Sequence, residues 1–410
     1  MDTAAEGAQA EGLRNALVDS LRAQGDVRSP QVEAALRAVP RHAFLPLVPL
    51  ATAYANDVVQ TKLDESSVPI SAASQPSIVA LMLDQLQVSP GDRILEIGAG
   101  TGYNAALLAR LAGPQGLVTT VDVDEDIAAG ARAALGATGY PQVRVVTGDG
   151  ALGYAAGAPY DRVIATVGAW DLPLAWLGQL SPAGRLVVPL RLRGSVTRSI
   201  AFERDAAWPG VPRWRSVSTH LCTFMPLRGG VADDPATALP LAPDGSVSLA
   251  VHQDQAVNPA ALAGALAAPP DAQWTGVTFT RAGHASAEWL VLWLTCTLRA
   301  PLSRLSARRE ALEYLMPLFP WGTMATADDA SLAYLGARPA GDDAREVGVI
   351  GHGPRGAELA REAAAQVQAW DRHYRAATAS FTVQPVSAPV PRASQFAFRT
   401  PHCWLGVDWQ

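Results

Sequence analysis

The sequence predicts an α/β protein with a doubly wound, mostly parallel sheet, followed by a second domain of the α+β class. Short β-rich runs alternate with helical runs between about residues 90 and 190, and the connections between them are short. A stretch rich in Pro, Gly, Asp and Ala at 228–246 has no hydrophobic periodicity, which is typical of a linker. The rhythm of strands and helices changes beyond it. We therefore expect domains at 1–229 and 230–410.

The first segment, residues 8–45, has the pattern of one or two amphipathic helices that end where Pro40 and Pro46 interrupt "VPRHAFLP". Strands and helices then alternate, which predicts parallel strands with right-handed crossovers. Two later runs could close the edge of the sheet. The alternating runs are "RILEI", "YNAALLARLA", "LVTTVDV", "DIAAGARAALGATG", "VRVVTGD", "YDRVIATV", "PLAWLGQL" and "GRLVVPL", and the edge candidates are "RSIAFER" and "STHLCTFMPL".

The second domain is predicted to combine strands at 273–280, 289–298 and 345–350 with a long helix at about 356–375. The run at 289–298, "WLVLWLTCTL", is far shorter than the roughly 20 residues of a membrane helix, and it is interpreted as a buried strand. We expect no membrane partner.

Composition excludes several classes of function. The chain has 410 residues, of which 49% are hydrophobic, and its net charge of −6 argues against nucleic acid as a partner. The N-terminus lacks an apolar core of signal-peptide length, so a cytoplasmic location is expected. Cys222, Cys296 and Cys403 are far apart and show no metal-binding spacing, so no metal is expected. Composition leaves the oligomeric state open.

A glycine-rich loop follows the first strand of the alternating segment, in "ILEIGAGTGYN". The strand delivers Glu96 to its carboxyl end, and Gly98, Gly100 and Gly102 then make a turn into a helix. Glycines at alternate positions permit positive φ and let a ligand lie against the backbone. A tight turn without a ligand is the alternative.

Two more acidic residues end the next two strands. Asp122 follows the loop by about twenty residues, where an acidic side chain can accept both ribose hydroxyls of a nucleoside. Asp149, followed by Gly150, could accept a hydrogen bond from the exocyclic amine of adenine. Each residue alone is more often a helix N-cap or a turn residue. Together with Glu96 they favour an adenosine site.

The spacing of the loop distinguishes two adenosine ligands. A dinucleotide loop has the pattern G-x-G-x-x-G, whereas this loop has E-x-G-x-G-x-G, with Glu96 just ahead of the first glycine. A carboxylate there would repel a pyrophosphate and suits a ligand that carries an ammonium and a sulfonium. S-adenosylmethionine is therefore the preferred cofactor.

Over about residues 10–230 the chain resembles the protein-L-isoaspartate O-methyltransferases. The resemblance implies a class I methyltransferase fold and methyl transfer to a side-chain or isoaspartyl carboxylate of a peptide. It also implies that residues 98–102 hold the methionine part of the cofactor, Asp122 the ribose, and Asp149 with Gly150 the adenine. The matching motifs are "VPRHAFLP", "ISAASQPSIVALMLDQL", "ILEIGAGTGYNAALLARL", "VTGDGALGYAAGAPYDRVIAT", "LPLAWLGQLSPAGRLVVPL" and "FMPLRG".

The resemblance places Ser74, in "SQP", at the active-site serine of the family. The loop at 60–73 looks longer than the family's compact loop, so Ser71 competes for this role. A structural alternative is that Ser74 caps the helix that begins near Pro76. A carboxylate acceptor with a pKa of about 4 is ionised at neutral pH, so no catalytic triad or general base is expected.

The chain continues for some 180 residues beyond the family motifs. A literal G-x-G-x-x-G at Gly351, Gly353 and Gly356 suggests a second nucleotide site, but Asp371 lies within the following helix and no βαβ unit follows. A plain strand-to-helix turn is the better interpretation. The arrangement, with "GAELAREAAAQVQAWDRHYR" near the end, is similar to methyltransferases associated with ribosomally made peptides, notably lanthipeptides. That resemblance implies esterification of a precursor aspartate, leading to a succinimide (aspartimide) or isoaspartate.

Three functions follow from the sequence. The first hypothesis is a tailoring O-methyltransferase for a lanthipeptide-like precursor, and the second is repair of isoaspartyl residues in damaged proteins. The third is a binding module that retains S-adenosylmethionine only for structure, against which the intact acids and glycines argue. In all three the partner is a peptide. The second domain is predicted to select it, with Trp370, Trp404 and Trp409 as candidates for exposed contact residues.

Overall fold

The structure is a computed structural model of the 410-residue chain. The residues that it describes are 3–65, 67–208, 210–229, 236–252, 255, 257–267, 269–280, 284–319, 322–391 and 394–410. Residues 230–235 of the linker predicted at 228–246 therefore lie outside the described residues, while its later part begins the second sheet.

The N-terminal helices form as predicted. Ser29 accepts a hydrogen bond from the backbone N–H of Val32 at 3.3 Å, and Pro30 occupies the first helical position, so the second helix has both an N-cap and a preset φ. A short hairpin then precedes the helix that leads into the main sheet. The elements are α1 (Thr3–Gln24), α2 (Pro30–Ala38), η1 (Arg41–Phe44), α3 (Leu50–Ala53), β1 (Val59–Leu63), β2 (Pro69–Ala73) and α4 (Pro76–Leu86).

The alternating segment forms a doubly wound sheet, which confirms the predicted fold class. Strands β5, β4, β3, β6 and β7 are parallel neighbours in that order, and β8 and β9 continue the sheet as antiparallel strands. The elements are β3 (Arg93–Ile97), α5 (Tyr103–Ala112), β4 (Leu117–Asp122), α6 (Glu125–Ala137), β5 (Arg144–Thr147), η2 (Gly150–Leu152), β6 (Tyr160–Ala165), α7 (Leu174–Gln179), β7 (Leu180–Arg191), β8 (Thr197–Arg204) and β9 (Trp214–Leu221).

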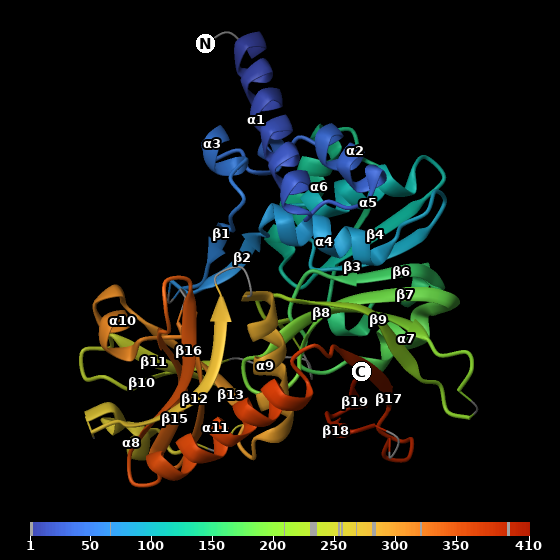
Figure 1. Cartoon of the computed structure of the whole chain (residues 1–410). Coiled ribbons are helices and arrows are strands. Elements are labelled where there is room, and N and C mark those ends of the chain that lie inside the picture. The colour runs from blue at the N-terminus through green and yellow to red at the C-terminus, as the bar shows by residue number, and fades with distance from the viewer. Residues whose placement is uncertain are drawn as a thin grey trace.

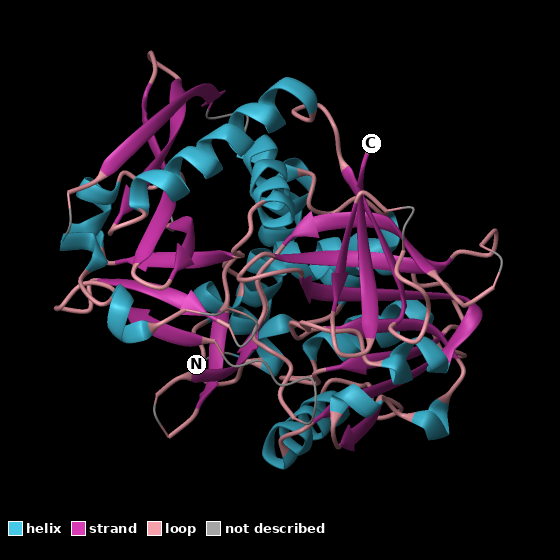
Figure 2. Ribbon diagram, turned by 90° about the horizontal axis from the view of Figure 1, so that it is seen from below, coloured by secondary structure: helices cyan, strands magenta, loops and turns pink. Residues whose placement is uncertain are grey.

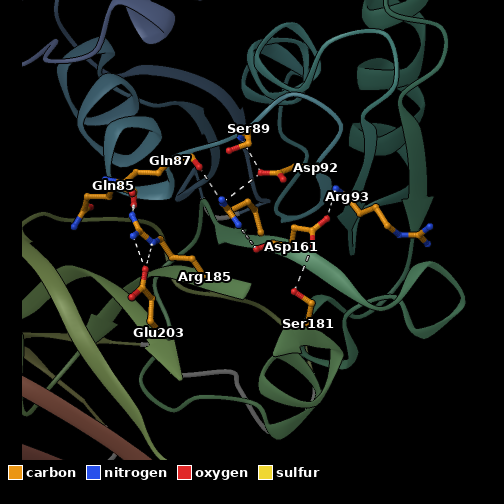
Figure 3. Close-up of polar contacts among 10 residues, drawn as sticks. Gln85, Gln87, Ser89, Asp92, Arg93, Asp161, Ser181, Arg185 and Glu203 are labelled. Carbon is orange, nitrogen blue, oxygen red and sulfur yellow. Dashed lines mark hydrogen bonds and ion pairs between the residues drawn. The ribbon is translucent and has the colours of Figure 1, made fainter. Parts of the chain in front are cut away.

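Polar contacts fix the end of α4 against this sheet (Figure 3). Arg185 of β7 donates from Nη1 to the carbonyl oxygen of Gln85 at 2.8 Å, and its Nε donates to Glu203 at 3.0 Å. Arg162 of β6 donates from Nε to the carbonyl oxygen of Gln87 at 3.0 Å. Orphan carbonyls at the helix C-terminus are thereby satisfied. Because α4 begins just after Ser74, this anchor also positions the start of the helix.

The last strands of the chain return to the first sheet, which corrects the predicted domain boundary. β17 (Ala379–Pro385) pairs with β9 through Thr382 and Val383, and β19 (Cys403–Trp409) and β18 (Phe396–Arg399) follow it. The sheet therefore has ten strands (Figure 1). A strand left at the edge, here β9, presents unpaired backbone groups, and the C-terminal strands pair with them. Residues 230–410 thus do not form one separate unit.

The intervening segment forms a second sheet of seven strands, all antiparallel, in the order β10-β11-β13-β14-β15-β16-β12. Figure 2 shows this group of strands apart from the ten-stranded sheet. The α+β character is as predicted. The elements are β10 (Thr237–Pro240), β11 (Val247–Val251), α8 (Pro259–Leu262), β12 (Asp271–Thr280), α9 (His284–Thr297), β13 (Leu302–Ala307), α10 (Arg309–Leu315), β14 (Thr323–Asp328), β15 (Ser331–Pro339), β16 (Ala344–His352) and α11 (Gly356–His373).

The predicted strand at 289–298 is wrong, because this run lies in the helix α9. A run that is apolar on every side is compatible with a buried helix as well as with a buried strand, and periodicity does not separate the two. The other predicted elements, strands at 273–280 and 345–350 and the helix at 356–375, correspond to β12, β16 and α11.

The G-x-G-x-x-G in the extension is a closely packed turn. A Cβ on Gly351 would lie 2.0 Å from the carbonyl oxygen of Gly356, and a Cβ on Gly353 would lie 2.3 Å from that of Ala330. These glycines let β16, the turn and the start of α11 approach one another, in keeping with the interpretation as a plain turn.

The two sheets meet at the turn between β7 and β8. A Cβ on Gly194 would lie 2.1 Å from the carbonyl oxygen of Leu302, so the two backbones are in direct contact. Ser195 donates its N–H to the same oxygen at 2.7 Å, and its hydroxyl accepts the N–H of Arg304 at 3.0 Å. Arg193 donates to carbonyl oxygens at the C-terminus of α9, including that of Thr295 at 2.9 Å. Backbone contact and hydrogen bonds together therefore hold the two sheets at this junction.

The three tryptophans predicted to be exposed are buried or half-buried. Trp370 is fully buried and packs near Phe279, and Trp404 is half-buried. Trp409 packs edge-to-face against Trp293 of α9 with ring centroids 5.7 Å apart. Trp409 thus joins the returning strand β19 to α9, and the prediction of exposed contact residues is wrong for Trp370.

Two further kinds of feature, a membrane-spanning helix and a metal-binding cluster, are absent from the described part of the chain. No helix there is long and apolar enough to span a membrane. Within the same residues, no group of three or more His, Cys, Asp or Glu side chains is placed to hold a metal ion. All three cysteines are free and buried.

A chain that ends after residue 229 should fail to fold cooperatively. It would expose the edge of β9 and the apolar cluster that Leu192 and Val196 share with Leu290 and Leu302. Thermal unfolding followed by circular dichroism should show one cooperative transition for the full chain and none for the truncated one. A cooperative transition in the truncated chain, with retained cofactor binding, would contradict the shared core.

Candidate functional site

A cavity of about 860 Å³ lies at the carboxyl ends of β3 and β4. All but two of the predicted site residues line it, and the exceptions are Gly102 and Asp149. The carboxyl ends of neighbouring parallel strands meet at one edge of the sheet, which explains why residues distant in sequence come together there. The predicted residues in the lining are Ser71, Ser74, Glu96, Gly98, Gly100, Asp122 and Gly150.

The three glycines of the loop all have positive φ but differ in surroundings. A Cβ on Gly98 would lie 2.8 Å from Oγ1 of Thr166, so this position packs against the segment that directly follows β6. A Cβ on Gly100 would have no neighbour within 4 Å, so its backbone faces open space in the cavity. A Cβ on Gly102 would approach the carbonyl oxygen of Ala131 at 3.2 Å. Gly102 therefore serves the packing of α5 against α6.

Glu96 is a fully buried carboxyl group in the cavity wall. Asn104 donates a hydrogen bond to its Oε1 at 2.7 Å, while its Oε2 accepts none from the described residues. Burial raises the pKa of Glu96 to about 7, and the charge of Asp122 adds to this, although contacts with Thr120 and Asn104 lower it. The group would be fully ionised at neutral pH only beside a cation.

Asp122 ties the glycine loop to the end of β4. Its Oδ2 accepts the backbone N–H of Gly100 at 3.0 Å, and its Oδ1 accepts that of Asp124 at 3.2 Å. The carboxylate therefore holds the loop open at the point where Gly100 faces the cavity, and it lines the same cavity.

Of the two residues predicted to bind the adenine, Asp149 and Gly150, only Gly150 lines the cavity. Oδ1 of Asp149 accepts the N–H of Ala151 at 2.9 Å and caps the short helix η2, while its neighbour Gly150 faces the cavity. A Cβ on Gly150 would lie 2.6 Å from Cγ2 of Ile97, so only glycine fits there. Trp176 fixes this turn by donating to the carbonyl oxygen of Gly150 at 2.8 Å.

Ser74 lies in the turn between β2 and α4, and its cap interpretation is wrong. The N-cap of α4 is Gln75, which makes no side-chain cap, and the free N–H of Ser77 instead donates to Oδ1 of Asn56 at 3.0 Å. The hydroxyl of Ser74 makes no hydrogen bond within the described part of the chain. Arg41 holds the turn by donating from Nη1 to the carbonyl oxygen of Ser74 at 3.0 Å.

Ser71 also lines the cavity but is more constrained. It lies on β2, is 8% exposed, and its Oγ accepts the hydroxyl of Thr61 on β1 at 2.9 Å. Ser74 therefore has the freer hydroxyl of the two.

Ion pairs tie two distant segments to the start of α6, and one of their members, Arg228, lines the cavity. Lys62 of β1 lies 2.7 Å from Asp126 and 3.9 Å from Asp124, and Arg228 pairs with the same Asp124 at the start of α6. Lys62 and Arg228 come from segments far apart in the sequence, and no local motif marks them. The β1–β2 hairpin and the segment after β9 are thereby both attached to the start of α6.

The second sheet supplies the opposite side of the cavity. Glu288 of α9 lines it and lies 3.6 Å from the buried guanidinium of Arg198 on β8. Arg304, Phe319 and Met324 line it as well. No local pattern in the sequence predicts this contribution, because it depends on how the two sheets dock.

Comparisons with known proteins agree with this site. The profile of the family "Protein-L-isoaspartate(D-aspartate) O-methyltransferase" matches residues 12–208. The protein-L-isoaspartate O-methyltransferase of Methanoregula boonei is 40% identical over 216 residues, which cover 53% of this chain and 93% of that relative. Protein-L-isoaspartate O-methyltransferase 1 of Rhodopseudomonas palustris is 43% identical over 183 residues, covering 44% of this chain and 70% of that relative.

A solved structure named protein-L-isoaspartate O-methyltransferase matches 97% of this chain and 99% of its own, with 22% identity and a TM-score of 0.51. This likeness shows that the overall fold is shared over nearly the whole chain. The sequence relatives cover the part that contains the glycine loop, Asp122 and Ser74. The chain therefore belongs to the protein-L-isoaspartate O-methyltransferase family and is an S-adenosylmethionine-dependent O-methyltransferase with the class I fold.

Proposed function

We propose that this protein transfers a methyl group from S-adenosylmethionine to the free carboxylate of an isoaspartyl residue in a peptide or protein. The observation that supports this most directly is the single cavity, in which Gly100 and Asp122 share a space with Ser74. The acceptor class rests on the names of the relatives, which are protein-L-isoaspartate O-methyltransferases.

The residues at the glycine loop fit the cofactor. Glu96 presents a buried carboxyl oxygen without a hydrogen-bond donor, which suits a cationic ligand, and the space above Gly100 is open for it. We assign the ribose to Asp122 and the adenine to Asp149 with Gly150, of which Gly150 faces the cavity. When bound, the cofactor supplies a methyl group on a sulfonium, which an ionised carboxylate oxygen can attack directly.

The protein's own task is to orient the acceptor and to exclude water. An isoaspartyl carboxylate is ionised at neutral pH, so no side chain has to remove a proton from it. Ser74 can donate one hydrogen bond to it, which positions the carboxylate without fully neutralising its charge. Ser71 is the alternative donor in the same cavity.

A second candidate substrate is an aspartate of a ribosomally made, lanthipeptide-like precursor, whose ester would cyclise to a succinimide. The observation in its favour is that the second sheet closes the acceptor side of the cavity through Glu288 and Phe319, which could select one peptide. The extension alone does not favour it, because a solved structure named protein-L-isoaspartate O-methyltransferase shares the fold over nearly the whole chain.

The two substrates can be distinguished with the full chain. We expect methyl incorporation into a short linear isoaspartyl peptide and none into the matched peptide with an ordinary aspartate, measured with methyl-labelled cofactor. A thioether-cyclised precursor peptide serves as the third substrate. Methylation of its aspartate, with no transfer to the isoaspartyl peptide, would contradict the proposed substrate and support peptide tailoring.

Replacing Ser74 tests the acceptor site. Ser74→Ala should lower kcat/KM for the isoaspartyl peptide by roughly ten- to a hundredfold, because a hydrogen bond to a charged group contributes about 1.5–3 kcal/mol. Cofactor affinity measured by calorimetry should not change. Ser71→Ala is the matched control. A silent Ser74→Ala combined with a large loss in Ser71→Ala would transfer the role to Ser71.

The raised pKa of Glu96 predicts pH-dependent cofactor binding. Because the free protein holds a proton on Glu96 below its pKa of about 7, a cationic cofactor must displace that proton. Affinity should therefore fall by up to about tenfold per pH unit as pH decreases from 7 towards 5. Calorimetry in buffers of different ionisation enthalpy should detect proton release. Glu96→Gln should bind weakly without this dependence, and equal pH profiles for both proteins would contradict the pairing.

A further inference from the structure

Arg41 is a buried cation without a counter-charge. Its side chain is 1% exposed, it lies on η1, and it pairs with no carboxylate among the residues that the structure describes. Burial lowers the pKa of its guanidinium, although the group stays charged at neutral pH. Leaving an ion buried and unpaired is unfavourable unless a ligand or partner compensates it. The contacts of Arg41 within the described residues therefore do not compensate its buried positive charge.

Two of the three guanidinium nitrogens of Arg41 donate hydrogen bonds to the described residues, and the third does not. Its Nε donates to the carbonyl oxygen of Ala53 at 2.9 Å and its Nη1 to that of Ser74 at 3.0 Å, while its Nη2 has no partner in the described chain. The guanidinium carbon also lies 5.4 Å from the ring centroid of Tyr103. These contacts fix the plane of the guanidinium, so the direction of Nη2 is fixed as well.

The position of Arg41 connects it to the acceptor site. It lines the same cavity as Ser74, and it binds the backbone of Ser74 directly. The other arginines of the cavity wall have different surroundings. Arg228 pairs with Asp124, and Arg304 lies on the second sheet, where its N–H binds Ser195. Arg41 is thus the basic side chain built into the serine turn.

We propose that Nη2 of Arg41 binds the carboxylate of the acceptor residue beside Ser74 and so determines the preference for an anionic acceptor. This inference rests on the proposed function, because it takes the acceptor to be a carboxylate. It makes Arg41 a residue that contacts the substrate, in addition to its role in holding the turn.

One nitrogen suits this task better than a bidentate contact. A two-pronged guanidinium–carboxylate pair would occupy both acceptor oxygens, whereas Nη2 alone leaves one oxygen to react. Esterification then removes the negative charge of the acceptor. Arg41 therefore holds the carboxylate substrate more tightly than the neutral ester product, which favours product release.

The experiment compares two peptides of nearly identical shape. One carries an isoaspartyl carboxylate and the other the corresponding isoasparagine amide, and binding is measured in the presence of S-adenosylhomocysteine, so that no transfer occurs. The wild type should prefer the carboxylate peptide by about tenfold or more, as a charge-assisted hydrogen bond implies. Arg41→Met should bind both peptides equally, and Arg41→Lys should recover part of the preference. Arg37→Met, which removes a partly exposed arginine of α2 outside the cavity, should retain the full preference.

A purely structural role for Arg41 predicts a different result. It would lower thermal stability in Arg41→Met while preserving the ratio of the two affinities, and that outcome overturns the inference. A wild type that binds both peptides equally overturns it without any variant, so a misfolded Arg41→Met would not prevent the test. A wild type that binds neither peptide, and methylates no isoaspartyl peptide, refutes the proposed function itself.

Discussion

The site depends on a backbone contact between the two sheets. At Gly194 the turn between β7 and β8 touches the carbonyl group of Leu302 so closely that no side chain fits between them. Ser195 adds hydrogen bonds on both sides of this contact, and Arg193 satisfies the end of α9. The same docking places Glu288 and Phe319 in the wall of the cavity. Without it the cofactor crevice would be open on the acceptor side.

The cavity wall contains two buried groups of opposite charge, and the two reactants also carry opposite charges. Glu96 is a buried acid whose Oε2 lacks a donor, and Arg41 is a buried base whose Nη2 lacks an acceptor. The first lies beside the glycine loop and the second beside the serine turn, so each suits one of two oppositely charged reactants. A sulfonium and a carboxylate become a thioether and an ester, both neutral. A site that stabilises the two separate charges therefore binds both products more weakly than the reactants.

Burial of these groups also explains why the fold is extensive around them. Unpaired ions in a low-dielectric interior destabilise the folded state, and the rest of the structure has to offset that cost. The apolar cluster that runs from the first sheet into α9 and α11 is shared by both parts of the chain. The C-terminal strands add to it by pairing with β9, and their aromatic side chains pack against α9.

The sequence alone determined the doubly wound sheet, the glycine loop with Glu96 and Asp122, and the serine turn, because each depends on local patterns of apolar residues, glycines and acids. It could not separate a buried helix from a buried strand at 289–298, since both are apolar throughout. Only the tertiary structure decided that β17 to β19 complete the first sheet, that Asp149 caps a turn while Gly150 faces the cavity, and that Arg41 and Glu288 reach the site. Such features depend on which edges pair and which surfaces dock, and pairing between segments distant in the chain leaves no periodic signal in either one.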